Sequence, residues 1–181
     1  MRKIKTLLLA LIIMVGCIGC SIQSKEEFKN GTNPDIKINT TTKENDKDIA
    51  FTLTIDNHMI NEDDNYDKLD KAIQEKYPKD KNLVEALPIV VTKEMSVKDV
   101  IDDFAKANDI NIVYGDMSGM SYIISINGLG SKTLGASSGW LYTINGELPL
   151  TSIDKTMVKE NDKISFVYTV DGGKDVGFSF E

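Results

Sequence analysis

Both cysteines of this 181-residue chain, Cys17 and Cys20, lie within its first 20 residues. The stretch from Ser21 to Glu181 therefore contains no disulfide, no thiolate metal site and no cysteine nucleophile. A stretch without cross-links has to be stabilised by burying apolar side chains. Because 41% of the residues are hydrophobic, the sequence has the material for one core of ordinary domain size.

The N-terminus has the order of a bacterial secretory signal. Arg2, Lys3 and Lys5 precede an apolar run from Leu7 to Val15, which small residues and the two cysteines close. A transmembrane helix needs roughly 20 apolar residues, and this run is about half that length. We therefore expect the segment to be processed and not to remain as a membrane span.

The end of the apolar run resembles the bacterial lipoprotein box, in which a cysteine that follows a small residue is lipidated. Met14-Val15-Gly16-Cys17 has the apolar residue that the box prefers three positions before the cysteine, whereas the frame ending at Cys20 has Cys17 there. We expect residues 1–20 to be a lipoprotein signal peptide with Cys17 lipidated, as by palmitate, and Cys20 as the alternative. A cleaved signal followed by free thiols is the third possibility. Lipidation implies an anchor at the extracellular face of the cell membrane.

The charge of the chain excludes one class of partner. When Arg2, Lys3 and Lys5 of the signal are left out, the chain has 18 lysines and 28 acidic residues. Its formal net charge then falls from −7 to −10. Arg2 is the only arginine, so the exported part has no guanidinium for bidentate phosphate recognition. Nucleic acid would be repelled by this surface.

Composition and periodicity divide the rest of the chain into a polar linker, residues 21–47, and one domain, residues 48–181. Ser96 is expected to cap the clearest helix, whose apolar face carries Val97, Val100, Ile101, Phe104 and Ala105 before Asn108 ends it. A shorter helix is expected from Asp64 or Asn65 to Pro78. Alternating apolar residues predict strands at 49–55, 87–92, 110–114, 122–126, 140–144 and 163–170.

This order of elements predicts an α+β domain, with one main helix packed on a β-grasp-like mixed sheet. Four dipeptides mark the turns between the strands. They are Asn127-Gly128, Asn145-Gly146, Asn161-Asp162 and Gly172-Gly173.

The segment from about Met95 to Asp175 resembles the bacterial domain family named for its similarity to the C-terminal domain of transcobalamin. The likeness lies in the helix start at 96–101, in Tyr122 to Gly128, in Ser138 to Glu147, and in the strand 163–168 entered through Glu160-Asn161-Asp162. The resemblance implies a β-grasp module on a bacterial surface protein, with cobalamin or another corrinoid-like flat molecule as ligand. We expect this chain to differ from the vitamin B12 carriers, because its 181 residues predict no large helical domain. It also has Asn161-Asp162 where the family commonly has Gly-Asp.

Two aromatic residues are the strongest candidates for contacting such a ligand. Trp140 and Tyr142 are two apart on one predicted strand and therefore point to the same face, directly after a Gly- and Ser-rich loop, residues 128–139. With Ser138, Gly139 and Asn145 they form the predicted ligand-binding set. The alternative is that Trp140 is a core residue beneath the helix.

Enzyme chemistry is not expected, and we predict no catalytic and no metal-binding residues. His58 is the only histidine and has no serine or cysteine partner near it in the sequence. The acidic run Glu62-Asp63-Asp64 lacks the spacing of a calcium loop, and residues 128–133 lack the order of a phosphate-binding loop. No cofactor is expected beyond cobalamin as a ligand.

The sequence thus predicts a lipid-anchored extracellular ligand-binding module. Its partners would be the membrane, through the N-terminal lipid, and a corrinoid or other small molecule. The alternative is a structural or protein-interaction module in a cell-surface assembly, with a surface protein as partner.

The lipidation site is open to a direct test. Metabolic labelling with a palmitate analogue should mark the wild-type protein and should fail on Cys17→Ala, because the acylated thiol is then missing. Labelling that survives Cys17→Ala and disappears in Cys20→Ala would move the anchor to Cys20.

Overall fold

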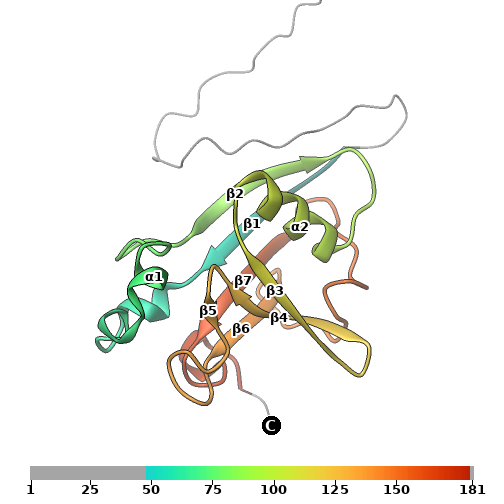
Figure 1. Cartoon of the computed structure of the whole chain (residues 1–181). Helices are drawn as coiled ribbons and strands as arrows, with labels where there is room; N and C mark the ends of the chain where they lie inside the picture. Colours follow the sequence, from blue (N-terminus) through green and yellow to red (C-terminus); the bar gives the residue numbers. More distant parts are fainter. Residues whose placement is uncertain (1–47, 180–181) are drawn as a thin grey trace, which may run out of the picture. The chain divides into compact units, whose positions relative to one another are not determined.

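The computed structural model describes residues 48–179, which form a sheet-rich domain with one main helix (Figure 1). The predicted signal peptide, the lipidation sites and the linker 21–47 lie outside the described residues. Within residues 48–179, none of the helices has the length and apolar character needed to cross a membrane.

The main sheet has four strands in the order β2-β1-β7-β6. Its two central strands, β1 (Ile49–Asp56) and β7 (Lys163–Thr169), run parallel. The outer strands, β2 (Val84–Val91) and β6 (Gly139–Ile144), are antiparallel to their neighbours. A parallel central pair formed by the first and last strands of the domain is the β-grasp arrangement, so the predicted fold class is confirmed.

One face of this sheet carries the core. On β1, Phe51, Leu53 and Ile55 are buried, whereas the threonines between them are only partly covered. Ile164 and Phe166 continue the buried row on β7. This alternation is why the sheet needs a helix on one side only.

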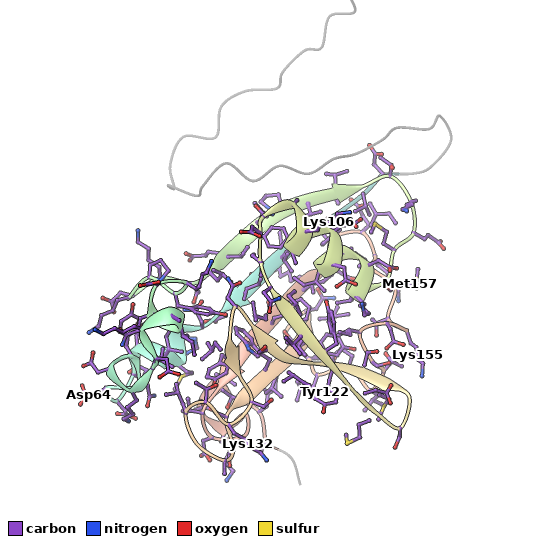
Figure 2. All side chains as sticks on the ribbon, in the orientation of Figure 1. Asp64, Lys106, Tyr122, Lys132, Lys155 and Met157 are labelled. Carbon is purple, nitrogen blue, oxygen red and sulfur yellow. The ribbon has the colours of Figure 1, made fainter. Side chains whose placement is uncertain are left out.

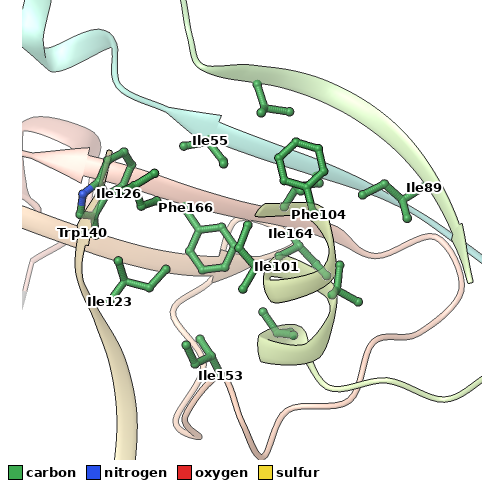
Figure 3. Close-up of a cluster of buried hydrophobic side chains, with 14 of the residues drawn as sticks. Ile55, Ile89, Ile101, Phe104, Ile123, Ile126, Trp140, Ile153, Ile164 and Phe166 are labelled. Atoms are coloured by element: carbon green, nitrogen blue, oxygen red, sulfur yellow. The ribbon is translucent and has the colours of Figure 1, made fainter. Parts of the chain in front are cut away.

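The covering helix is α2 (Val97–Ala107), and it begins and ends where the sequence predicts. The Ser96 hydroxyl accepts a hydrogen bond from the Asp99 amide at 3.1 Å, and the Asp99 carboxylate accepts one from the Ser96 amide at 3.2 Å. At the other end, the Asn108 side chain donates to the Phe104 carbonyl at 2.8 Å. Figure 3 shows Ile101 and Phe104 of α2 directed toward the side chains of β1 and β7.

A second, smaller sheet follows α2. It contains β3 (Ile112–Met117), β4 (Met120–Ile126) and the short β5 (Leu129–Gly130) in that order. Strands β3 and β4 form a hairpin, called here the β3–β4 hairpin. In Figure 3, Ile123 and Ile126 of β4 lie beside Trp140 of β6, so the two sheets share one core.

The predicted helix ending at Pro78 is wrong. Within the predicted range the chain forms two short helical turns, η2 (Tyr66–Lys68) and α1 (Lys71–Gln74), and a separate turn, η1 (His58–Asn61), precedes them. Leu69 and Asp70, which separate η2 from α1, both have an extended backbone with ψ of 145°, so the chain does not continue as one helix. The Asn65 side chain does not cap a helix, because its amide donates to the Met59 carbonyl at 3.0 Å. A fourth short helix, η3 (Lys174–Val176), follows β7.

The helix cap provides a test of the fold. Ser96→Ala should lower the free energy of unfolding by about 1 kcal/mol, because the cap of α2 is lost. The Ser96 hydroxyl is also the main reason that the pKa of Asp99 is lowered. A lowered carboxyl pKa stabilises the folded state above the unfolded pKa, and this contribution disappears as the pH falls through the folded pKa.

The cost of Ser96→Ala should therefore be larger at about pH 7 than at about pH 2, as measured by urea denaturation. Ser137→Ala is the matched control, because Ser137 is exposed and lies outside any helix. An equal cost at both pH values would contradict the coupling between Ser96 and Asp99.

Candidate binding face

Trp140, the first predicted ligand contact, lies on the core side of β6. Its indole is only 9% exposed, and its Nε1–H donates to the Leu129 carbonyl at 2.8 Å. The ring meets the edge of Tyr168 with centroids 5.2 Å apart. Trp140 is therefore a core residue. This position is the alternative to a ligand contact that the sequence left open.

Three aromatic side chains donate hydrogen bonds into one short stretch, residues 126–130, called here the 126–130 segment. The Tyr77 hydroxyl donates to the Ile126 carbonyl at 2.6 Å, and the Tyr168 hydroxyl donates to the Gly130 carbonyl at 2.9 Å. Trp140 supplies the third bond, at Leu129. Burial raises the pKa of both tyrosines, so both hydroxyls keep their protons and remain donors.

Tyr142 faces the same side of β6 as Trp140, as predicted, and is half-buried. Its ring lies 6.4 Å from that of Phe166. Its hydroxyl donates to the Thr151 carbonyl and lies 3.1 Å from the Thr156 hydroxyl. Tyr142 therefore fastens the loop after β6 to the sheet.

The Gly- and Ser-rich loop is closed by its own hydrogen bonds. The Ser138 hydroxyl accepts from the Leu134 amide at 3.1 Å and lies 3.0 Å from the Gly135 carbonyl. The Lys132 amide donates to the Ser138 carbonyl at 2.9 Å. Gly139 begins β6 directly behind this loop. Ser138 thus has the contacts of a residue that shapes the loop.

Asn145, the last of the predicted set, has a turn-forming position with φ of 56°. Its side-chain oxygen accepts from the Lys163 amide at 2.9 Å, and its side-chain nitrogen donates to the Asp162 carboxylate at 3.1 Å. Both polar atoms are used within the fold. Ligand binding by the five predicted residues stays a prediction.

Exposed apolar side chains gather elsewhere, on the outer face of the β3–β4 hairpin. Val113, Met117, Met120 and Tyr122 are each between 42% and 63% exposed. The strand register pairs Met117 with Met120 and Gly115 with Tyr122, so these side chains share one face. We call this set of four the hairpin face; Figure 2 labels Tyr122 on it.

Gly115 shapes the hairpin face by having no side chain. A Cβ at this position would overlap Cζ of the Tyr122 ring. The ring therefore lies directly over the backbone of the neighbouring strand, which makes the face flat at this point. No residue of the hairpin face carries a charge, although the chain as a whole has a net charge of −7.

The opposite face of the hairpin attaches it to the domain. Ile123 enters the core, and its register partner Tyr114 lies against α2. The Tyr114 hydroxyl donates to the Asp102 carboxylate at 2.5 Å, and Lys98 Nζ lies 4.2 Å from the centroid of the Tyr114 ring. Burial is the main cause that raises the pKa of Tyr114, and the Asp102 carboxylate adds to it. This half-buried cluster of Tyr114, Asp102 and Lys98 holds strand β3 of the hairpin against helix α2.

We did not predict the hairpin face from the sequence, although the alternation of residues along β3 and β4 indicates it. Val113, Gly115 and Met117 alternate with the residues of the inner face, and Met120 and Tyr122 repeat the alternation after the Ser118-Gly119 turn. Strand periodicity gives two faces but does not say which one the core covers.

No candidate metal site is found among residues 48–179. No group of three or more histidine, cysteine, aspartate and glutamate side chains in this range could hold a metal ion. His58 is exposed and lies 2.7 Å from the Asp56 carboxylate two residues before it.

Comparison with solved structures supports the fold class. A match is found to "Crystal Structure of Haptocorrin in Complex with Cbi", with a TM-score of 0.50 and 13% sequence identity. The match covers 71% of this chain and 26% of the haptocorrin chain, so the chain spans about a quarter of that structure. At this identity the likeness shows a shared, transcobalamin-like fold.

Comparison of sequences adds a family match. Residues 95–170 match the family described as "Domain of unknown function (DUF4430)". This range begins just before α2 and ends just after β7, so it contains the covering helix, the β3–β4 hairpin and strands β6 and β7. Among curated proteins, none matches the sequence.

The role of Trp140 can be measured. Trp140→Phe keeps an aromatic ring in the core but removes the donor to the buried Leu129 carbonyl. It should lower the free energy of unfolding by about 1–3 kcal/mol, and Trp140→Ala should cost about 3–5 kcal/mol. In the wild-type protein, acrylamide should barely quench the tryptophan emission.

Tyr122→Phe is the control for this experiment, because Tyr122 is exposed, and its cost should stay within about 0.5 kcal/mol. Strong quenching of the native indole, or a Trp140→Phe variant as stable as the wild type, would contradict a core role.

Proposed function

We propose that this chain is a non-enzymatic binding module held at the extracellular face of a bacterial membrane by a lipid on Cys17. In this proposal, the domain meets a flat, largely apolar ligand, such as a corrinoid, on the hairpin face. The observation that carries it is the uncharged hairpin face, which stands out from an acidic protein. Exposed apolar patches of this kind mark places where something else binds.

Two features support a flat ligand. The Tyr122 ring lies over Gly115 and presents an aromatic surface, on which a planar molecule can stack. The methionines beside it are flexible and polarisable, which suits an irregular apolar outline. The fold shared with a haptocorrin whose structure contains Cbi is consistent with this chemistry but does not identify the ligand.

The five residues predicted from sequence remain the competing location for a ligand. Of these, Trp140 and Ser138 are buried, and Asn145 has its side-chain atoms engaged within the fold. A ligand at Trp140 would have to displace the hydrogen bond to Leu129. The geometry therefore favours the hairpin face as the ligand site.

A second candidate function is protein interaction through a sheet edge. Strand β3 is the outer strand of its sheet and pairs only with β4 among residues 48–179. Its other edge can accept an extended segment of a partner protein by strand addition. The apolar hairpin face would then lie beside the added strand and contribute contacts to it.

Calorimetric titration tests the leading proposal. The probes are cobalamin and cobinamide, and the protein is the full chain with both cysteines changed to serine, so that no lipid is present. This protein should give saturable heat. Tyr122→Ala should weaken binding at least about tenfold, or 1.4 kcal/mol, because the stacking surface is lost.

Val90→Ala is the control, because Val90 is an exposed apolar residue of β2 outside both the hairpin face and the predicted set, and this variant should bind like the parent protein. Binding that survives Tyr122→Ala and is lost in a folded Trp140→Phe variant would place the ligand at β6. An absence of saturable heat at high micromolar ligand would reject a corrinoid and leave protein interaction as the better function.

A further inference from the structure

Two methionines face each other at the tip of the β3–β4 hairpin. Met117 ends β3, Met120 begins β4, and the two are register partners. Side chains of such a pair lie on the same face, with Cβ atoms about 4.5–5.5 Å apart. Two flexible thioethers at this separation can reach one common point.

The turn between the methionines is held by several contacts. Ser118 and Gly119 have φ of 56° and 75°, as a tight two-residue hairpin turn requires. The Gly119 amide donates to the Asp116 carboxylate at 3.1 Å, and Lys155 Nζ donates to the Gly119 carbonyl at 2.8 Å. The fold therefore presets the methionine pair.

Both methionines are open to solvent. Met117 is 63% exposed and Met120 is 42% exposed, whereas Met59 and Met95 are buried in the core. Thioether sulfur is a soft ligand, and soft ligands favour Cu(I) over hard divalent ions. Unlike cysteine, methionine offers this sulfur without a thiol that has to be deprotonated.

The Tyr122 ring adds a third soft group beside the pair. Tyr122 is two residues after Met120 on the same face, and its ring lies over Gly115, two residues before Met117. An aromatic face attracts a cation that lies close above it. Met117, Met120 and Tyr122 are thus neighbours on one face of the hairpin.

The charges at the hairpin tip do not oppose a monovalent cation. Asp116 accepts from the turn, and the Asp154 carboxylate accepts from the Ser121 amide at 3.4 Å. One cation, Lys155, contacts the same turn. Two carboxylates and one ammonium group therefore surround the tip, in a protein of net negative charge.

We propose that Met117 and Met120 bind one soft monovalent metal ion of the Cu(I) class, with the Tyr122 ring against it. The site does not depend on the proposed corrinoid function. It binds the ion without any change of oxidation state.

Silver(I) is the probe, because it is a soft monovalent ion that does not change oxidation state in water. The protein is the full chain with Cys17→Ser and Cys20→Ser, since the two thiols would compete for the metal. In NMR spectra with labelled methionine methyl groups, one equivalent of Ag(I) should shift the signals of Met117 and Met120. The signals of Met59, Met95 and Met157 should stay in place.

The double variant Met117→Leu/Met120→Leu should weaken Ag(I) binding at least tenfold, because leucine keeps the apolar area but has no sulfur. Met157→Leu is the matched control, because Met157 is 43% exposed but lies outside the pair. Zinc should leave the methionine signals unchanged.

Three results would overturn the proposal: no methyl shift at stoichiometric Ag(I), equal shifts at Met157, or unchanged affinity in the folded double variant. The double variant also separates the two functions of the hairpin. A corrinoid or protein that uses only the apolar area should still bind to it, whereas Tyr122→Ala should impair that binding.

Discussion

The two sheets of this domain are joined by hydrogen bonds from aromatic side chains to the backbone of the 126–130 segment. Tyr77, Trp140 and Tyr168 come from a loop, an outer strand and a central strand, and each reaches a different carbonyl of that segment. A buried carbonyl without a donor is costly, so these bonds fix where the segment lies. The β3–β4 hairpin is continuous with the segment, and its position depends on them.

The residues that resemble a known family mainly specify this framework. Trp140 bonds to Leu129, Tyr142 fastens the following loop, and Asn145 ties its turn to Asp162. The motif is therefore a good predictor of fold. It says much less about a ligand, because its aromatic and polar atoms are satisfied inside the domain.

Much of the fold could be predicted from the sequence, because its strongest signals are local. The cap at Ser96 and the alternation of β7 need no knowledge of the rest of the chain. The helix ending at Pro78 could not be judged in this way, because the chain is extended at Leu69 and Asp70, in the middle of the predicted range. The hairpin face was also beyond local reasoning, since burial is decided by which sheet packs on which side.

Substitutions in this domain can affect either its core or its outer surface, and the contact between Gly115 and Tyr122 belongs to the outer surface. Substitutions at Trp140 or Tyr168 act on the bonds that hold the sheets together. Substitutions at Gly115 act on an exposed ring and leave those bonds alone. One added methyl group would lift the ring and change the outline of the surface, while the core beneath stayed the same. This outer surface can thus be altered by a single residue without any change in the contacts that make the domain fold.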